Sequence, residues 1–242
     1  MARTRTFKHQ PPAPTTITVK VDASEAVEAV RAESAKILAE LNPAPRIMPN
    51  FFIRMNSGDT FHYNDIDSNT FSLHDFAHNL SRINRFHGAT LGKPYSVAQH
   101  SCLVGDYLLQ HFDPLTAFIG LLHDGHEAVI GDIPTPFKKA LHFHGIDVNA
   151  VFADPIDAWL FKSAGIKNQL PAYIIAAVKT ADAVLYQHEG RQLMRNFVPS
   201  KLPDDAAPYT AHITPWASEE AYRQFLSRFN RWKPLAVNQN GA

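Results

Sequence analysis

The sequence has little cysteine, no net charge and no long apolar run. Its one cysteine among 242 residues, Cys102, excludes a disulfide within the chain and fits a reducing compartment. The absence of any run of about 18 apolar residues predicts no membrane span. The first residues are basic but lack the apolar core of a secretory signal. These absences favour a cytoplasmic protein.

The charge balance points away from nucleic acid and toward a small-molecule partner. Lys and Arg together number 23, as do Asp and Glu. An extended nucleic-acid surface would need a basic excess, although a local basic pocket is compatible with this balance. Hydrophobic residues make up 45% and charged residues 19%, proportions that are typical of a globular chain.

The pattern of apolar residues and prolines predicts an N-terminal extension, residues 1–48, and a helical domain, residues 49–242. We expect the extension to hold a loose tail, a short strand at 16–21 and an appended helix at 22–41. The domain opens with a β-hairpin at 51–63 around the turn signal NSGD. Helices are expected from Ser72 to about Arg85 and at 97–110, 114–128, 135–143, 150–164, 170–194 and 218–230. The fold class is therefore all-α with one small hairpin.

The most informative segment is HDGHEAVIGDIPTPFK, residues 123–138. On a continuous helix, at about 100° per residue, His123, Asp124 and Glu127 share one face, whereas His126 lies off it and Gly125 points away. An apolar run at 117–122 precedes them and predicts a buried helix whose polar end reaches a cavity. Buried histidine and carboxylate groups need partners, so we favour a metal ion over the alternative, a hydrogen-bonded core network.

Two more helices offer one candidate ligand each, His100 and Asp182. With His123 and Asp124 they complete a set of two imidazoles and two carboxylates. Such a mixed set suits one divalent ion of the Mn, Co, Ni, Fe or Zn type better than Ca or Mg, with Mg retained as an option.

The order His100, His123-Asp124, Asp182 resembles the signature of the HD superfamily of metal-dependent phosphohydrolases. The longer run at 123–138 is similar to the bacterial 5′-deoxynucleotidase branch, which has the form HDxxExxxGDxPTPxK there. That branch also carries an arginine–aromatic pair about fifteen residues before the first histidine, and Arg85-Phe86 stands at that spacing here. Its usual aromatic residue is Trp rather than Phe. The similarity covers about residues 74 to 194, half of the chain.

The resemblance implies an HD-domain helical bundle and assigns roles to its matching residues. It implies that His100, His123, Asp124 and Asp182 hold the metal ion. Glu127 and Asp132 are the candidate general acid and base, because attacking water must lose a proton and the leaving oxygen must gain one. The candidate substrate-binding residues are those expected to contact the phosphate or the base of the substrate. They are Arg85, Phe86, Thr135 and Lys138.

The expected activity is hydrolysis of nucleotides, most simply removal of the 5′-phosphate from 2′-deoxynucleoside monophosphates. The main alternative is a dNTP triphosphohydrolase, which would attack the α-phosphorus and release triphosphate. A nucleotide sensor without turnover and a di-iron oxygenase are further alternatives; the oxygenase would need a second metal, for which only His126 offers a nearby ligand. The resemblance also implies a homodimer or higher homo-oligomer.

Overall fold

The computed structural model describes residues 27, 28, 30–34, 36, 50–204 and 206–240. The chain divides into two compact units, Met1–Pro49 and Asn50–Ala242. In the first unit the described residues are helical and exposed, within the range of the expected appended helix. The strand expected at 16–21 and the rest of the helix expected at 22–41 lie outside the described residues.

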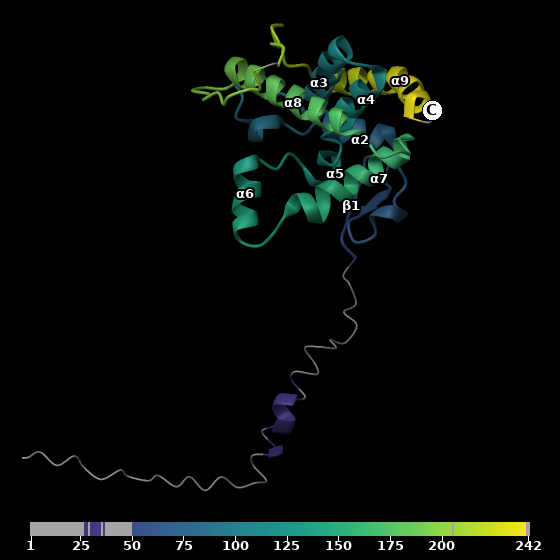
Figure 1. The fold of residues 1–242 in the computed structure, drawn as a ribbon, viewed down its shortest axis with the longest axis vertical. Coiled ribbons are helices and arrows are strands. Elements are labelled where there is room, and N and C mark those ends of the chain that lie inside the picture. The colour runs from purple at the N-terminus through teal and green to yellow at the C-terminus, as the bar shows by residue number, and fades with distance from the viewer. Residues whose placement is uncertain (1–26, 29, 35, 37–49, 205, 241–242) are drawn as a thin grey trace, which may run out of the picture. The chain divides into compact units, whose positions relative to one another are not determined.

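The second unit is built almost entirely of helices, which confirms the all-α prediction (Figure 1). A two-stranded antiparallel hairpin pairs Ile53 with Phe61, as expected for 51–63. In chain order the elements are β1 (Phe52–Arg54), β2 (Thr60–His62), η1 (Ile66–Ser68), α2 (Leu73–Leu80), η2 (Arg85–Gly88), α3 (Val97–His111), α4 (Pro114–Leu122), α5 (Glu127–Ile130), α6 (Thr135–Phe143), η3 (Asn149–Ala153), α7 (Asp154–Ala164), α8 (Ala172–Leu193) and α9 (Ser218–Asn240).

Helix α4 is the centre of the bundle. It packs on α3, α7, α8 and α9, and every residue from Leu115 to Leu122 is buried. This is the buried apolar helix that the sequence predicts. Figure 1 shows the hairpin, α5 and α7 on one side of the unit and α3, α8 and α9 on the other, with α2 between them in contact with α5 and α9. Helix α6 stands at the edge and has no buried residue.

Side-chain caps set where the two central helices begin. Ser96 accepts a hydrogen bond from the backbone N–H of Gln99 and starts α3, and Asp113 accepts one from Thr116 and starts α4. Each cap satisfies a backbone N–H that has no partner within the helix. The caps thereby fix the register of the two helices that bring in the expected ligand histidines.

The helix expected from Ser72 ends earlier than predicted, at Leu80. The reason is a competing backbone pairing: Val97 donates to the carbonyl of Ile83 at 3.0 Å and Arg85 donates to Tyr95 at 2.9 Å. These bonds replace helical ones and tie the segment after α2 to the start of α3.

The last helix runs to Asn240, ten residues past the expected end at 230, with Pro234 inside it. Trp232, Ala236 and Asn240 are buried at a four-residue spacing, so one face of the added turns packs against the bundle. The Asn240 side chain also accepts hydrogen bonds from the backbone N–H groups of residues 167 and 168. Tertiary packing therefore outweighs the tendency of Pro234 to end the helix.

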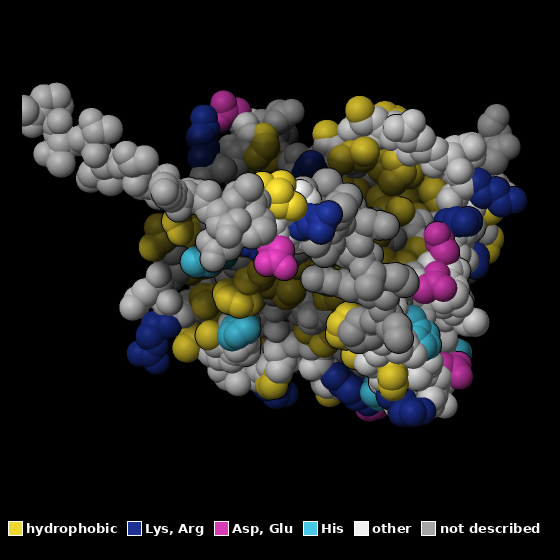
Figure 2. All heavy atoms as spheres, turned by 90° about the horizontal axis from the view of Figure 1, so that it is seen from below, with side chains coloured by type: hydrophobic (Ala, Val, Ile, Leu, Met, Phe, Trp, Pro, Cys, Tyr) yellow, Lys and Arg dark blue, Asp and Glu magenta, His cyan; other side chains and the backbone are white. Residues whose placement is uncertain are grey.

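The described helices and the face drawn in Figure 2 can be compared with what a membrane span or a basic stripe would need. Among the described residues, no helix combines the length and apolar character needed to cross a bilayer. On the face that Figure 2 shows, the described Lys and Arg side chains stand singly or in small groups among apolar and acidic ones.

Candidate metal centre

The His123-Asp124 pair lies where α4 ends, and the helix expected at 114–128 is not continuous. Residues 123–126 form tight turns, in which Gly125 donates to the carbonyl of Leu122 and Glu127 donates to Asp124. Such bonds between residues three apart give about three residues per turn, unlike an α-helix. The prediction of one continuous helix from 114 to 128 is therefore wrong at residues 123–126.

His126 consequently lies elsewhere than expected, whereas Gly125 points away from the ligands as predicted. A Cβ at Gly125 would come within 2.1 Å of Leu160 in α7, so only a residue without a side chain fits there. His126 joins Asp124 and Glu127 in one cluster, whose possible ligand atoms lie within 4.8 Å of one another.

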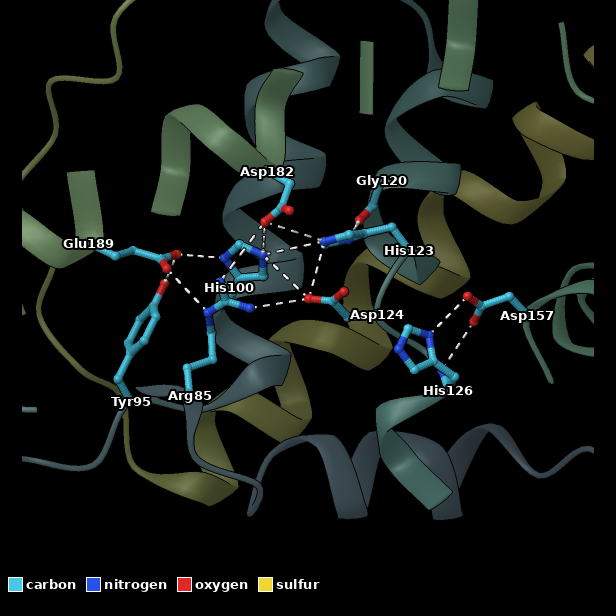
Figure 3. Close-up of polar contacts among 10 residues, drawn as sticks. All are labelled: Arg85, Tyr95, His100, Gly120, His123, Asp124, His126, Asp157, Asp182 and Glu189. Atoms are coloured by element: carbon cyan, nitrogen blue, oxygen red, sulfur yellow. Dashed lines mark hydrogen bonds and ion pairs between the residues drawn. The ribbon is translucent and has the colours of Figure 1, made fainter. Parts of the chain in front are cut away.

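Four side chains from three segments converge as the sequence predicts (Figure 3). His100 comes from α3, His123-Asp124 from the end of α4, and Asp182 from α8. His100 Nε2 lies 3.4 Å from His123 Nε2 and 3.1 Å from Asp182 Oδ1. His123 Nε2 lies 3.2 Å from Asp124 Oδ2 and 3.8 Å from Asp182 Oδ1.

These separations fit a single ion. Ligand atoms about 2.1 Å from one metal lie roughly 3.0–3.4 Å apart at octahedral or tetrahedral angles. The observed spacing is close to that range, and the donor set is two imidazole nitrogens and two carboxylate oxygens. The buried histidine, aspartate and glutamate groups here can hold a metal ion.

Both histidines are oriented by a bond through their other ring nitrogen. His100 Nδ1 lies 2.6 Å from Glu189 Oε1, and His123 Nδ1 lies 2.8 Å from the carbonyl oxygen of Gly120. A carbonyl or carboxylate there holds the proton on Nδ1 and leaves Nε2 as a free donor atom for a metal.

The charges at the centre are strongly coupled. Burial disfavours the charged ring of His123, but Asp124 and Asp182 outweigh burial and raise its pKa well above the usual range. Burial likewise raises the pKa of Asp124, yet His123 and His100 outweigh it and lower that pKa. The carboxylates therefore favour positive charge at this centre, which is the charge that a metal ion would supply.

Arg85 lies inside this centre rather than at its rim. It is buried, with Nε 3.2 Å from Glu189 Oε2 and Nη1 3.2 Å from Asp124 Oδ2. Burial would lower its pKa, but Glu189, Asp124 and Asp182 raise it, so the guanidinium stays charged. The expected phosphate-binding residue is therefore already paired with carboxylates.

A cavity of about 470 Å³ opens beside the metal ligands. Asp124 and Asp182 reach its wall from the ligand set. The structure also brings together there all the residues expected to act on or bind substrate: Arg85, Phe86, Glu127, Asp132, Thr135 and Lys138.

The two candidate acid–base residues carry shifted pKa values. Burial, with Asp124 and Asp132 adding to it, raises the pKa of Glu127 well above its usual range. Burial also raises the pKa of Asp132, against the lowering effect of Arg85. Carboxyl groups that keep a proton to higher pH are suited to donate it during a reaction.

An aromatic wall borders the cavity. Phe86 stacks on Tyr186 with ring centroids 5.7 Å apart and an angle of 28°. Phe86 and the next residue, His87, both have positive φ values, 55° and 57°. Backbone held in this unfavourable region commonly occurs at functional sites.

Two further carboxylates, Glu189 and Asp157, belong to the centre. Glu189 bonds His100, Arg85 and the hydroxyl of Tyr95, and it is fully buried. Its position seven residues after Asp182, two turns along one helix face, was the available signal for Glu189. Asp157, which bonds His126, had no such signal.

Comparison with known proteins places the chain in a family. No family model matches it. The uncharacterized protein YfdR of Escherichia coli is 35% identical over 182 residues, covering 74% of this chain and 94% of YfdR. The chain belongs to the same family as YfdR. The uncharacterized protein RCAP_rcc00048 of Rhodobacter capsulatus is 34% identical over 145 residues, covering 58% of this chain and 71% of that protein.

Proposed function

We propose that the protein is a divalent-metal-dependent phosphohydrolase that removes the 5′-phosphate of 2′-deoxynucleoside monophosphates. The observation that carries the proposal is the convergence of His100, His123, Asp124 and Asp182 beside a cavity whose wall Asp124 and Asp182 reach. The HD-type motif order supports it. An ion of the Mn, Co, Ni, Fe or Zn type held there supplies Lewis acidity toward a phosphate oxygen and the attacking water.

The residues around the cavity provide the proton transfers. Hydrolysis breaks the bond between phosphorus and the 5′-oxygen, forms a new one to water oxygen, and moves one proton from water to the leaving side. Glu127, whose pKa is raised further, is assigned the acid that protonates the leaving oxygen. Asp132, also on the cavity wall, is assigned the base that accepts the proton of water.

Cationic and aromatic groups give the cavity its substrate preference. Lys138 and the N–H groups of Arg85 are the positive groups that face a bound phosphate. The stacked rings of Phe86 and Tyr186 offer a flat surface to the base.

The number of cations favours a monophosphate over the rival triphosphate substrate. Among the described residues, the lysines and arginines on the cavity wall are Arg85 and Lys138. Two other arginines of the helical unit are engaged elsewhere: Arg54 bonds the carbonyl of Gly58, and Arg82 pairs with Glu219. One feature supports the alternative triphosphate substrate. Lys139 lines a neighbouring pocket together with Lys138, so the two lysines lie beside each other.

A product assay tests the proposal. Metal-stripped protein is incubated with each dNMP, NMP and dNTP after addition of Mn, Co or Mg, and products are separated by chromatography. We expect metal-dependent deoxynucleoside and phosphate from dNMPs, and none from a His123→Ala variant. His74→Ala is the matched control, because His74 bonds Tyr222 away from the centre.

Two outcomes would contradict the proposal. Release of intact triphosphate from dNTPs, with dNMPs left unchanged, would favour the triphosphohydrolase. Absence of turnover on every substrate, or equal turnover by His123→Ala, would remove the catalytic assignment.

A further inference from the structure

Helix α6 is held less firmly than the helices next to it in the chain. None of its residues is buried, whereas α5 and α7 are each anchored by buried side chains. Among the described residues, every hydrogen bond and ion pair recorded for residues 132–144 joins two residues of the stretch 132–147. An element with no buried side chain and no bond to the rest of the unit opens at little cost in free energy. Helix α6 therefore has the freedom to move.

A glycine with positive φ stands at each end of this segment. Gly131, which ends α5, has φ 79° and ψ 165°, and Gly145, which follows α6, has φ 83°. A Cβ at either position would meet no atom within 4 Å, so it is the backbone conformation and not the space that favours glycine. Between the two glycines, Pro134 and Pro136 stiffen the start of α6. The segment is therefore a rigid piece between two bends.

Two hollows lie between this segment and the bundle. The first is the cavity of about 470 Å³ beside the metal ligands, to which α6 contributes Thr135 and Lys138. The second is an apolar groove of about 460 Å³, which Leu141 lines from α6 and Val129 lines from α5. Ile133, just before α6, lines both hollows. A single inward movement of the segment would therefore narrow the cavity and the groove together.

The apolar groove favours such a movement, because its wall is open to water. Phe51 is 54% exposed and Ile146 48% exposed, and Leu141 is partly exposed. The polar side chain of the wall, Tyr63, already donates its hydroxyl hydrogen to the carbonyl of Val129. Water gains few hydrogen-bond partners there, so burying this surface against α6 is favourable.

Charge opposes the movement until a ligand is bound. Asp132, on the segment, faces the same cavity as Asp124 and Asp182 of the bundle, and like charges repel. A metal ion offsets those carboxylates, and a phosphate attracts Lys138. Binding of both therefore shifts the balance toward the inward position.

We propose that residues 132–144 form a lid that closes over the bound nucleotide by bending at Gly131 and at the turn around Gly145. Closing fills the apolar groove with side chains of α6 and carries Lys138 toward the phosphate and Asp132 toward the attacking water. It also excludes bulk water, which strengthens the electrostatic interactions inside the cavity. The inference rests on the proposed function, since the cavity that the lid covers is the one assigned to the nucleotide.

The distance between two spin labels tests the closure without any activity measurement. One label is attached at Phe143→Cys, on the exposed end of α6, and the other at the exposed position Asn64→Cys, beside the hairpin. Cys102 is buried and its pKa is raised to about 12, so the labelling reagent leaves it unmodified. The distance is measured by electron paramagnetic resonance in the full chain with Zn²⁺, which has no unpaired electron, before and after addition of dTMP. We expect dTMP to shift the distances to shorter values.

A substitution in the groove tests what drives the closure. Leu141→Ala removes apolar surface that only the closed lid buries fully, so we expect a smaller shift of the label distances and a rise of about tenfold in KM for dNMPs. The urea midpoint of unfolding should stay close to that of the wild type, because Leu141 is not buried in the open position. Leu235→Ala is the matched control: Leu235 is an exposed leucine on α9 that lines neither hollow, and its loss should change neither KM nor the distances.

The outcomes separate the lid from the proposed function. Unchanged label distances in a protein that hydrolyses dNMPs overturn the lid and leave the function. Equal KM values and equal distance shifts in Leu141→Ala and the wild type overturn the lid too. Shorter distances with dTMP but no turnover of any nucleotide support the lid and remove the function. No turnover and no change in distance remove both.

Discussion

Glu189 is the residue on which the orientation of the centre most depends. It is fully buried, and its two oxygens bond His100, Arg85 and Tyr95. His100 and Arg85 outweigh burial and lower its pKa, so the carboxylate is charged. A charged acceptor on His100 Nδ1 makes Nε2 a better metal ligand.

A Glu189→Gln substitution therefore weakens metal binding without touching a ligand. We expect a 10- to 100-fold loss of Mn²⁺ affinity, measured by calorimetric titration. Tyr95→Phe is the matched control: it removes one bond to the same carboxylate and leaves His100 in place. Affinity in Glu189→Gln equal to that of the control would mean that Glu189 only fills space.

The raised pKa of Glu127 makes the metal-free protein less stable at higher pH. In the unfolded chain the Glu127 carboxyl group has a pKa of about 4.3 and loses its proton above that pH. In the folded chain it keeps the proton to higher pH, because burial, Asp124 and Asp132 raise its pKa. The unfolded state then binds fewer protons, so stability falls from there up to the folded pKa. Glu127→Gln carries no such proton. In chelator, its melting temperature should increasingly exceed the wild-type value from pH 5 to pH 8; a lower value at pH 8 would contradict this.

Sequence indicated the candidate metal ligands at the residue scale but not every side chain that orients a histidine ring. His100, His123, Asp124 and Asp182 stand in a recognisable order. Asp157, by contrast, reaches His126 from another helix, and nothing in the local sequence marks it. Long-range partners of this kind depend on tertiary packing.

At the scale of elements, the turn between α4 and α5 decides where the ligands point. Gly125 is required there, because a Cβ would lie 2.1 Å from Leu160 Cδ2 and 2.9 Å from the carbonyl oxygen of Leu122. The second neighbour is backbone and cannot move aside cheaply. The close approach of α7 at this point also brings Asp157 to His126.

A Gly125→Ala substitution tests this close packing. Forcing a methyl group into a filled space typically costs about 1–3 kcal/mol, which urea unfolding would detect as a lower midpoint. Adding Leu160→Ala removes the nearer contact, so the double variant should lose less stability than the two single variants together. Gly125→Ala as stable as the wild type would show that α7 does not approach this closely.

Sequence predicted helix boundaries well where neighbouring residues set them, and less well where tertiary packing sets them. The Ser96 and Asp113 caps fix the starts of α3 and α4 within a few residues, and both were predictable. The passage of α9 through Pro234 depends on burial of Trp232 and Ala236, which no local rule reveals. The break after Leu122 likewise depends on packing at Gly125.

At the scale of the molecule, the core and the centre lie within Asn50–Ala242. Both the main apolar cluster and the metal-ligand residues fall in this range. The match with YfdR covers 94% of YfdR and 74% of this chain. Nearly all of YfdR therefore corresponds to part of this chain.

Residues 1–49 are therefore expected to be dispensable for folding and for metal binding. Described residues between 27 and 36 are exposed, so their removal takes little apolar surface from a core. A chain shortened to residues 50–242 should unfold in one transition close to that of the full chain and bind the same number of Mn²⁺ ions. If the shortened chain folds but loses turnover on dNMPs, the N-terminal residues complete the substrate site; if it fails to fold, they belong to the core. Equal folding, binding and turnover would assign the whole proposed chemistry to the helical unit.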